Sequence, residues 1–272
     1  MEKSSANLNL LTKEVRTAGV NLLRDFAEVQ LRQATMEGAD RLAARAAYRT
    51  EAQIVAALRE ARPNYGVTST FEGASAGADP TRRWVVQGIV GWKNFSRAFP
   101  HWGISAALEH KGKIAEAVIY DPYKDEMFRS QRGNGAYVNN MRLRVSRRKR
   151  LKELVVAEDR QNGAKGGLLD WSALEEQAGE VRRSGVAELD IVYVAAGRFD
   201  AFVSTRSNTI GFAASTMILS ESGGMSRTIL KGDSGKAHSD KRLHQVGLIA
   251  SNLNAFDRFA QLVRNHVTEV QG

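Results

Sequence analysis

The chain has 272 residues, a formal net charge of +9 and no cysteine, with 43% hydrophobic and 25% charged residues. A chain of this length buries a sizeable core, so we expect one large domain over 1–272, with approximate halves at 1–150 and 151–272. Disulfides and thiolate metal sites are excluded, and no apolar run approaches the ~20 residues of a membrane-spanning helix. The stretch Met1–Ser5 lacks the pattern of a signal peptide, so we expect a cytoplasmic protein that does not associate with membranes.

Two helices are predicted in the first part of the chain. Apolar side chains recur in steps of three and four over 8–33, which predicts an amphipathic helix with Asn7 or Asn9 as its N-cap. The alanine-rich stretch that follows predicts a second helix over 41–61. This helix should end before Pro63, because the residue preceding a proline disfavours the helical conformation.

Strands dominate the next part. Small residues predict a turn-like loop over 75–80, and β-branched and aromatic residues predict a strand over 84–90. The segments 103–109 and 114–120 flank a lysine- and glycine-containing turn, which is typical of a β-hairpin. A further strand is predicted over 126–131.

Strands and helices alternate in the second half. The predicted elements are helices over 187–196 and 212–222, a strand over 199–203, and a final helix over 254–267 capped at Asn252 or Asn254. The low-complexity tract 231–241 is predicted to be a loop. This alternation predicts an α/β fold.

The segment 84–95 has the outline of a strand that runs into a glycine turn. Its sequence, W-V-V-Q-G-I-V-G-W-K-N-F, resembles the segment W-V-I-D-P-I-D-G-T-T-N-F of the inositol monophosphatase family. Further matches are F-P-H-W-G-I-S-A-A-L at 99–108, A-E-L-D-I-V-Y-V-A-A-G-R-F-D at 187–200 and E-S-G-G at 221–224. The resemblance covers nearly the whole chain, is nearest to the bacterial SuhB-type branch, and implies a layered α-β-α-β-α sandwich.

Members of that family hydrolyse phosphate monoesters with magnesium ions, which need hard oxygen ligands, mostly carboxylates and water. The resemblance places the family's acidic ligands at positions that carry no acid here: Ala47, Thr70, Gln87, Val90 and Gly211. Lys93 takes the place of the threonine that positions the attacking water. The resemblance therefore implies a catalytically degenerate member, a pseudoenzyme with no catalytic residues and no magnesium.

A second hypothesis is a magnesium-dependent phosphatase that acts on a small phosphate monoester with relocated ligands. The nearby acids that could be recruited are Asp40, Glu51, Glu72 and Asp79. Convergence of three or more of these in one pocket would favour the phosphatase, whereas dispersal would favour the pseudoenzyme.

Two basic features are candidate binding residues. Lys93 and Arg97 lie beside the former metal motif, where a cation could hold an anion; the alternative is a lysine that only extends into solvent. The second feature is a basic run of seven residues: Arg142, Arg144, Arg147, Arg148, Lys149, Arg150 and Lys152.

The basic run is a candidate contact for nucleic acid or an acidic protein. The alternative is a solvated edge between a strand and a loop. No aromatic residue is interleaved with these charges, so base stacking is not indicated.

The function expected from the resemblance is binding, assembly or regulation, linked to RNA or transcription complexes by analogy with the SuhB-type branch. The partners expected are a second copy of the chain, as a homodimer, or an active paralogue, as a heterodimer. This expectation rests on the well-matched segment 99–146, which in relatives lies near the subunit contact.

Overall fold

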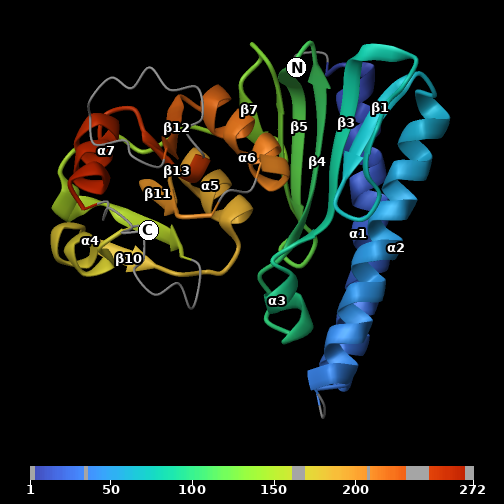
Figure 1. Ribbon diagram of the computed structural model, residues 1–272, viewed down its shortest axis with the longest axis horizontal. Helices are drawn as coiled ribbons and strands as arrows, with labels where there is room; N and C mark the ends of the chain where they lie inside the picture. The colour runs from blue at the N-terminus through green and yellow to red at the C-terminus, as the bar shows by residue number, and fades with distance from the viewer. Residues whose placement is uncertain (1–3, 34–35, 161–168, 207–208, 231–244, 267–272) are drawn as a thin grey trace.

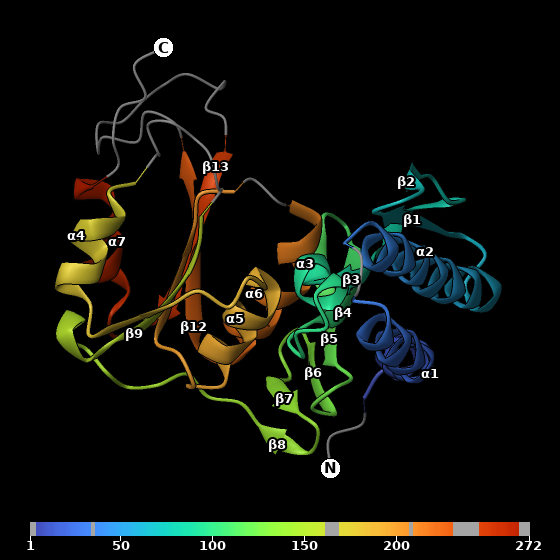
Figure 2. The ribbon, with the colours of Figure 1, turned by 90° about the horizontal axis from the view of Figure 1, so that it is seen from below.

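A computed structural model describes residues 4–33, 36–160, 169–206, 209–230 and 245–266. It contains two β-sheets and three layers of helices, stacked as α-β-α-β-α (Figures 1 and 2). Figure 2 shows the layers edge-on: the two N-terminal helices, then the first sheet, then two central helices, then the second sheet, then two further helices of the second half. The α/β sandwich expected from the sequence is confirmed.

The outer helical layer is a pair of long helices, α1 (Ala6–Leu31) and α2 (Met36–Ala61). The apolar stripe of α1 is buried as its spacing predicts, with Leu11, Val15 and Leu22 fully covered. The predicted caps at Asn7 and Asn9 are wrong: Ser5 is the N-cap, and its Oγ accepts a hydrogen bond from the backbone N of Leu8 at 3.0 Å. In the part of the chain that the structure describes, no helix is long and apolar enough to cross a membrane.

The first sheet has eight strands in the order β2-β1-β3-β4-β5-β6-β7-β8. The strands are β1 (Tyr65–Ser69), β2 (Gly73–Ser75), β3 (Asp79–Val90), β4 (Gly103–His110), β5 (Lys113–Asp121), β6 (Glu126–Gln131), β7 (Ala136–Val138) and β8 (Met141–Arg142). β4 and β5 confirm the predicted hairpin. The predicted loop over 75–80 is wrong at both ends, because Ser75 pairs with Val67 and Asp79 pairs with Tyr65.

The second sheet has five strands in the order β10-β9-β11-β13-β12. The strands are β9 (Val155–Asp159), β10 (Glu180–Arg182), β11 (Ala201–Ser204), β12 (Gly224–Leu230) and β13 (Gln245–Asn252). β11 begins two residues after the start predicted for it, because the chain turns at Gly197, where φ is 69°. The predicted loop over 231–241 lies outside the described residues.

The remaining helices are α3 (Trp92–Ser96), the short 3-10 turn η1 (Leu151–Glu153), α4 (Trp171–Gln177), α5 (Ala187–Ala195), α6 (Thr209–Glu221) and α7 (Phe256–Asn265). The helices predicted over 187–196 and 212–222 are confirmed as α5 and α6. The cap predicted for the last helix is wrong: α7 begins after Ala255, which makes no side-chain cap. Asn252 instead accepts a hydrogen bond from the backbone N of Ala255 at 3.0 Å and turns the chain before the helix.

The central helix α5 is buried along its whole length, because it lies between the two sheets. A helix covered on all sides should carry apolar residues all round, and most of α5 does. Two residues of its first turn break this rule, since Glu188 and Asp190 are also buried. Carboxyl groups in such a place indicate a site.

Candidate functional site: a charged cleft between the sheets

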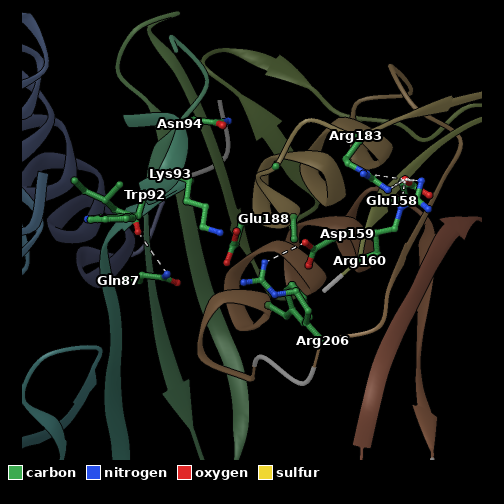
Figure 3. Close-up of a pocket in the computed structure, with 15 residues that line it drawn as sticks. Gln87, Trp92, Lys93, Asn94, Glu158, Asp159, Arg160, Arg183, Glu188 and Arg206 are labelled. Carbon is green, nitrogen blue, oxygen red and sulfur yellow. Dashed lines mark hydrogen bonds and ion pairs between the residues drawn. The ribbon is translucent and has the colours of Figure 1, made fainter. Parts of the chain in front are cut away.

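A cleft of about 630 Å³ lies where the first sheet meets the N-terminal end of α5 (Figure 3). Its walls come from the end of β3 and α3, from the end of β9, and from the chain around the start of α5. Charged side chains dominate it: Lys93, Glu158, Asp159, Arg160, Arg183, Glu188 and Arg206. Gln87, Trp92 and Phe212 contribute amide and aromatic surface.

The turn at Gly91 aims α3 at this cleft. Gly91 has φ of 80°, a left-handed conformation that favours glycine, and a Cβ at this position would lie 2.5 Å from Cγ2 of Val186. The amide of Asn94 donates to the backbone O of His101 and of Ser184, each at 2.9 Å. These bonds join α3 to the segment before α5, so the side chain of Lys93 points into the cleft from a fixed base.

The acids at the end of β9 are paired with arginines. Oε1 of Glu158 accepts from Arg160 at 2.7 Å and from Arg183 at 2.8 Å, while its buried Oε2 has no partner among the described residues. Asp159 lies 3.1 Å from Arg206 and accepts a hydrogen bond from the Ser204 hydroxyl at 3.0 Å. The burial of Glu158 raises its pKa.

Burial also perturbs the acids of α5. Desolvation, reinforced by the nearby Asp159 carboxylate, raises the pKa of Glu188 to about 7. The same two causes, with Glu188 as a further negative neighbour, raise the pKa of Asp190 to about 8. Both groups can therefore hold a proton near neutral pH.

Only some of the residues that the resemblance aligns with the family's metal site lie together in the structure. Gln87 and Lys93 both line the cleft. Val90 is fully buried in the apolar core beneath it, and Ala47 is buried within α2. Thr70 is exposed at the turn after β1, and Gly211 lies in the first turn of α6.

The acids named as replacement ligands do not converge. Glu51 is buried and accepts backbone hydrogen bonds from Phe71 at 2.7 Å and Gly88 at 3.2 Å. Glu72 pairs with Arg59 at the surface, and Asp79 accepts from Thr81 and Arg82 beside it. These roles are structural, and none of the replacement acids, Asp40 included, is among the residues that line the cleft.

Most residues of the cleft are not evident from the sequence. The resemblance aligns Glu188 with the last residue of a substrate-binding G-S-A-A turn of the family, and it singles out none of the other charged residues of the cleft apart from Lys93: Glu158, Asp159, Arg160, Arg183 and Arg206. A signal was present, since E-D-R directly follows the apolar strand residues V-V-A at 155–157. Charges at the end of a buried strand are typical of a site.

Comparison with known proteins decides the family. A model described as the inositol monophosphatase family matches residues 7–268. The chain belongs to the inositol monophosphatase family. An inositol-1-monophosphatase of Rhizobium meliloti is 37% identical over 226 residues, which are 82% of this chain and 85% of the relative.

SuhB proteins are also similar to this family member. The protein named Nus factor SuhB of Pseudomonas aeruginosa is 31% identical over 270 residues, 96% of each chain. The crystal structure of extragenic suppressor protein suhB from Bartonella henselae has a TM-score of 0.81 at 29% identity, covering 95% of this chain and 98% of that one.

Most of the charged side chains in this family member's cleft are paired with one another. Magnesium prefers ionised carboxylates and water in octahedral geometry. Here four cationic side chains line the cleft, and Glu158 and Asp159 are held by arginines. Within the described ranges, no group of three or more acids or histidines is placed to hold a metal.

The other basic candidates lie elsewhere. Arg97 is exposed one turn after Lys93 and is not among the residues that line the cleft. The basic run forms the connection from β8 to β9, between the two sheets. Arg148 and Arg150 form ion pairs with Asp200 and Glu153, while Arg142, Arg144, Arg147 and Lys149 are exposed.

Proposed function

We propose that this protein acts by binding or assembly and does not hydrolyse phosphate esters with magnesium. The observation that supports this proposal is the ammonium group of Lys93 in the cleft, with Glu158 and Asp159 already paired to arginine. A cation at this position opposes the binding of a second cation, because like charges repel.

A magnesium-dependent phosphatase that acts on a small phosphate monoester is the second candidate. The three carboxyl groups of Glu158, Asp159 and Glu188 in one cleft favour it. The contacts of these groups argue against a phosphatase. Arginines pair with Glu158 and Asp159, and the raised pKa of Glu188 disfavours its ionised form.

The test is phosphate release from inositol 1-phosphate at several magnesium concentrations, with the inositol-1-monophosphatase of Rhizobium meliloti as the positive control. We expect no release above that of a Glu158→Gln, Asp159→Asn double variant. Magnesium-dependent release that disappears in the double variant would overturn the proposal and support relocated ligands.

The proposed partners follow from the relatives and from the matched segment 99–146. Several relatives carry the name Nus factor SuhB, so we propose RNA or a protein of a transcription complex as the partner, in the cytoplasm. We also propose a homodimer, or a heterodimer with an active paralogue. Light scattering at tens of micromolar tests the homodimer, and a monomer mass both alone and after co-expression with the paralogue would reject both forms.

A further inference from the structure

Three polar groups in the cleft lack a protein partner within the described residues. The Lys93 side chain is exposed, points into the cleft and makes no hydrogen bond or ion pair there, whereas the Gln87 carbonyl oxygen and Oε2 of Glu158 are buried acceptors without a partner in the described part of the chain. Buried polar groups are nearly always satisfied in native proteins, by protein, water or a ligand. The two buried acceptors therefore need water or a ligand as a partner, and the Lys93 ammonium that points into the cleft favours an anionic ligand.

The charge of the cleft favours an anion. Four cationic side chains face two carboxyl groups held in ion pairs, Glu158 and Asp159, each of which is counted here with a full negative charge. The cleft is therefore positive by two charges when Glu188 is neutral and by one when it is ionised. An anion is attracted in both states, and more strongly in the first.

The protonation of Glu188 sets the net charge of the cleft. Only 6% of this residue is exposed, and its side chain and that of Lys93 point toward one another across the cleft (Figure 3). An anion held by Lys93 would therefore lie next to the Glu188 carboxyl group. Two negative groups in such contact repel, whereas a protonated carboxyl can donate a hydrogen bond to the anion.

We propose that the cleft binds a small oxyanion without any metal ion, that Lys93 holds the anion, and that Glu188 takes up a proton when the anion binds. The proposal rests on the proposed function only in that Lys93, not magnesium, supplies the positive charge. The ligand carries an oxyanion group such as sulfate, phosphate or carboxylate, and the affinity of the cleft for it depends on pH.

The groups that face Glu188 set the direction of this coupling. Its own helix contributes Asp190, and β9 with the residue after it contributes Glu158, Asp159 and Arg160. The opposite wall contributes Lys93, and the remaining charges are Arg183 and Arg206. Phe212 is the lining residue from α6 and does not titrate. Asp159 and Asp190 favour the proton on Glu188, and an anion on Lys93 adds to their effect.

The probe for the test is sulfate, because its charge stays constant over about pH 5 to 9, whereas phosphate itself titrates near neutral pH. Binding is measured by calorimetry with EDTA present, at constant ionic strength, in two buffers of different ionisation enthalpy. We expect saturable binding whose affinity falls with rising pH above about 7, by up to about one decade per pH unit, with proton uptake in that range.

Two variants and one control make the test specific. Lys93→Met should weaken binding at least about tenfold, because it removes a charge-assisted contact. Lys113→Met removes an exposed lysine at the far end of the sheet and should change nothing. Glu188→Gln has a neutral side chain of the same shape as the protonated glutamic acid. Its affinity for sulfate should therefore equal that of the wild type at pH 6 and should not change with pH.

Several outcomes would overturn the proposal. These are the absence of sulfate binding to the wild-type protein, binding that EDTA abolishes, unchanged binding in Lys93→Met, or an unchanged pH dependence in Glu188→Gln. Phosphate release with magnesium would instead reject the proposed function, so the two failures have separate readouts.

Discussion

The guanidinium of Arg148 lies 3.0 Å from the carboxylate of Asp200, a side chain with no exposed surface. Asp200 also accepts hydrogen bonds from the Ser146 hydroxyl and, at 2.8 Å, from the backbone N of Val155. This carboxylate therefore fixes the connection between the two sheets, and the basic run includes members that hold the fold together.

Removal of either partner of this ion pair should lower stability by different amounts. Asp200→Ala should lower the free energy of unfolding by about 3–5 kcal/mol, because it removes several hydrogen bonds from a buried position. Arg148→Gln should cost only about 1 kcal/mol, since Ser146 and Val155 still satisfy Asp200. Arg147→Gln, an exposed neighbour, is the control and should stay within about 0.5 kcal/mol. Urea unfolding measures all three, and equal effects of the two arginine variants would contradict the assignment.

Nucleic acid, if it binds, should contact the exposed members of the run. Replacement of Arg144, Arg147 and Lys149 with glutamine should flatten the slope of log affinity against log salt by about two to three units, because each phosphate contact contributes nearly one. The matched control is Arg148→Gln with Arg150→Gln, since both arginines are engaged in ion pairs. Titration of a labelled RNA at several salt concentrations measures the slope, and a triple variant with unchanged slope would identify the run as solvated charge.

Stability should fall as pH rises through neutrality. The pKa values of Glu188 and Asp190 rise from 4.5 and 3.8 to about 7 and about 8 in the folded protein. The folded state therefore binds these protons more tightly than the unfolded chain, so their stabilising contribution is complete below about pH 4 and is lost as pH rises through 7 and 8.

Glu188→Gln tests that contribution. Between pH 6 and 9, the free energy of unfolding of the wild type should fall by about 1–3 kcal/mol more than that of the variant. The reason is that one pKa unit corresponds to about 1.4 kcal/mol. Glu60→Gln, on the exposed face of α2, is the control and should leave the pH profile of urea unfolding unchanged. A wild-type profile that is flat over this range would refute the prediction.

Gly91→Ala should destabilise the protein by about 2–4 kcal/mol, since it combines a left-handed backbone with a methyl group 2.5 Å from Val186. Gly112→Ala shares the positive φ but meets nothing within 4 Å, so it should cost only about 1 kcal/mol. The double variant Gly91→Ala, Val186→Ala should recover part of the difference. Equal losses at Gly91 and Gly112 in thermal unfolding would show that the contact with Val186 is unimportant.

The sequence predicts the layers well because periodic burial is a local pattern. The helix over 8–33 follows from apolar residues in steps of three and four, and the hairpin at 103–120 follows from its lysine- and glycine-containing turn. The N-terminal end of α1 does not follow from the sequence, because Ser5, Asn7 and Asn9 are all good N-caps. Which of them caps the helix depends on where α1 meets the sheet. The resemblance to the family supplied Gln87 and Lys93, which do line the cleft.

The rest of the cleft depends on contacts between residues far apart in the chain. Glu158 and Arg183 are separated by 25 residues, and Asp159 and Arg206 by 47. The resemblance aligns Glu188 with a substrate-binding turn of the family, but it does not show which side chains Glu188 faces. The raised pKa of Glu188 arises from burial between two sheets, which no local pattern reveals.

The amide of Asn94 has a mechanical consequence. Its two hydrogen bonds, to the carbonyl groups of His101 and Ser184, fasten the rim formed by α3 to the rim that leads into α5. A hinge motion at this rim would break both bonds at once, so the walls there should move as one body. A ligand can then enter only if the long arginine side chains rotate. The ligands that bind are those that compete with Glu158 and Asp159 for the guanidinium groups.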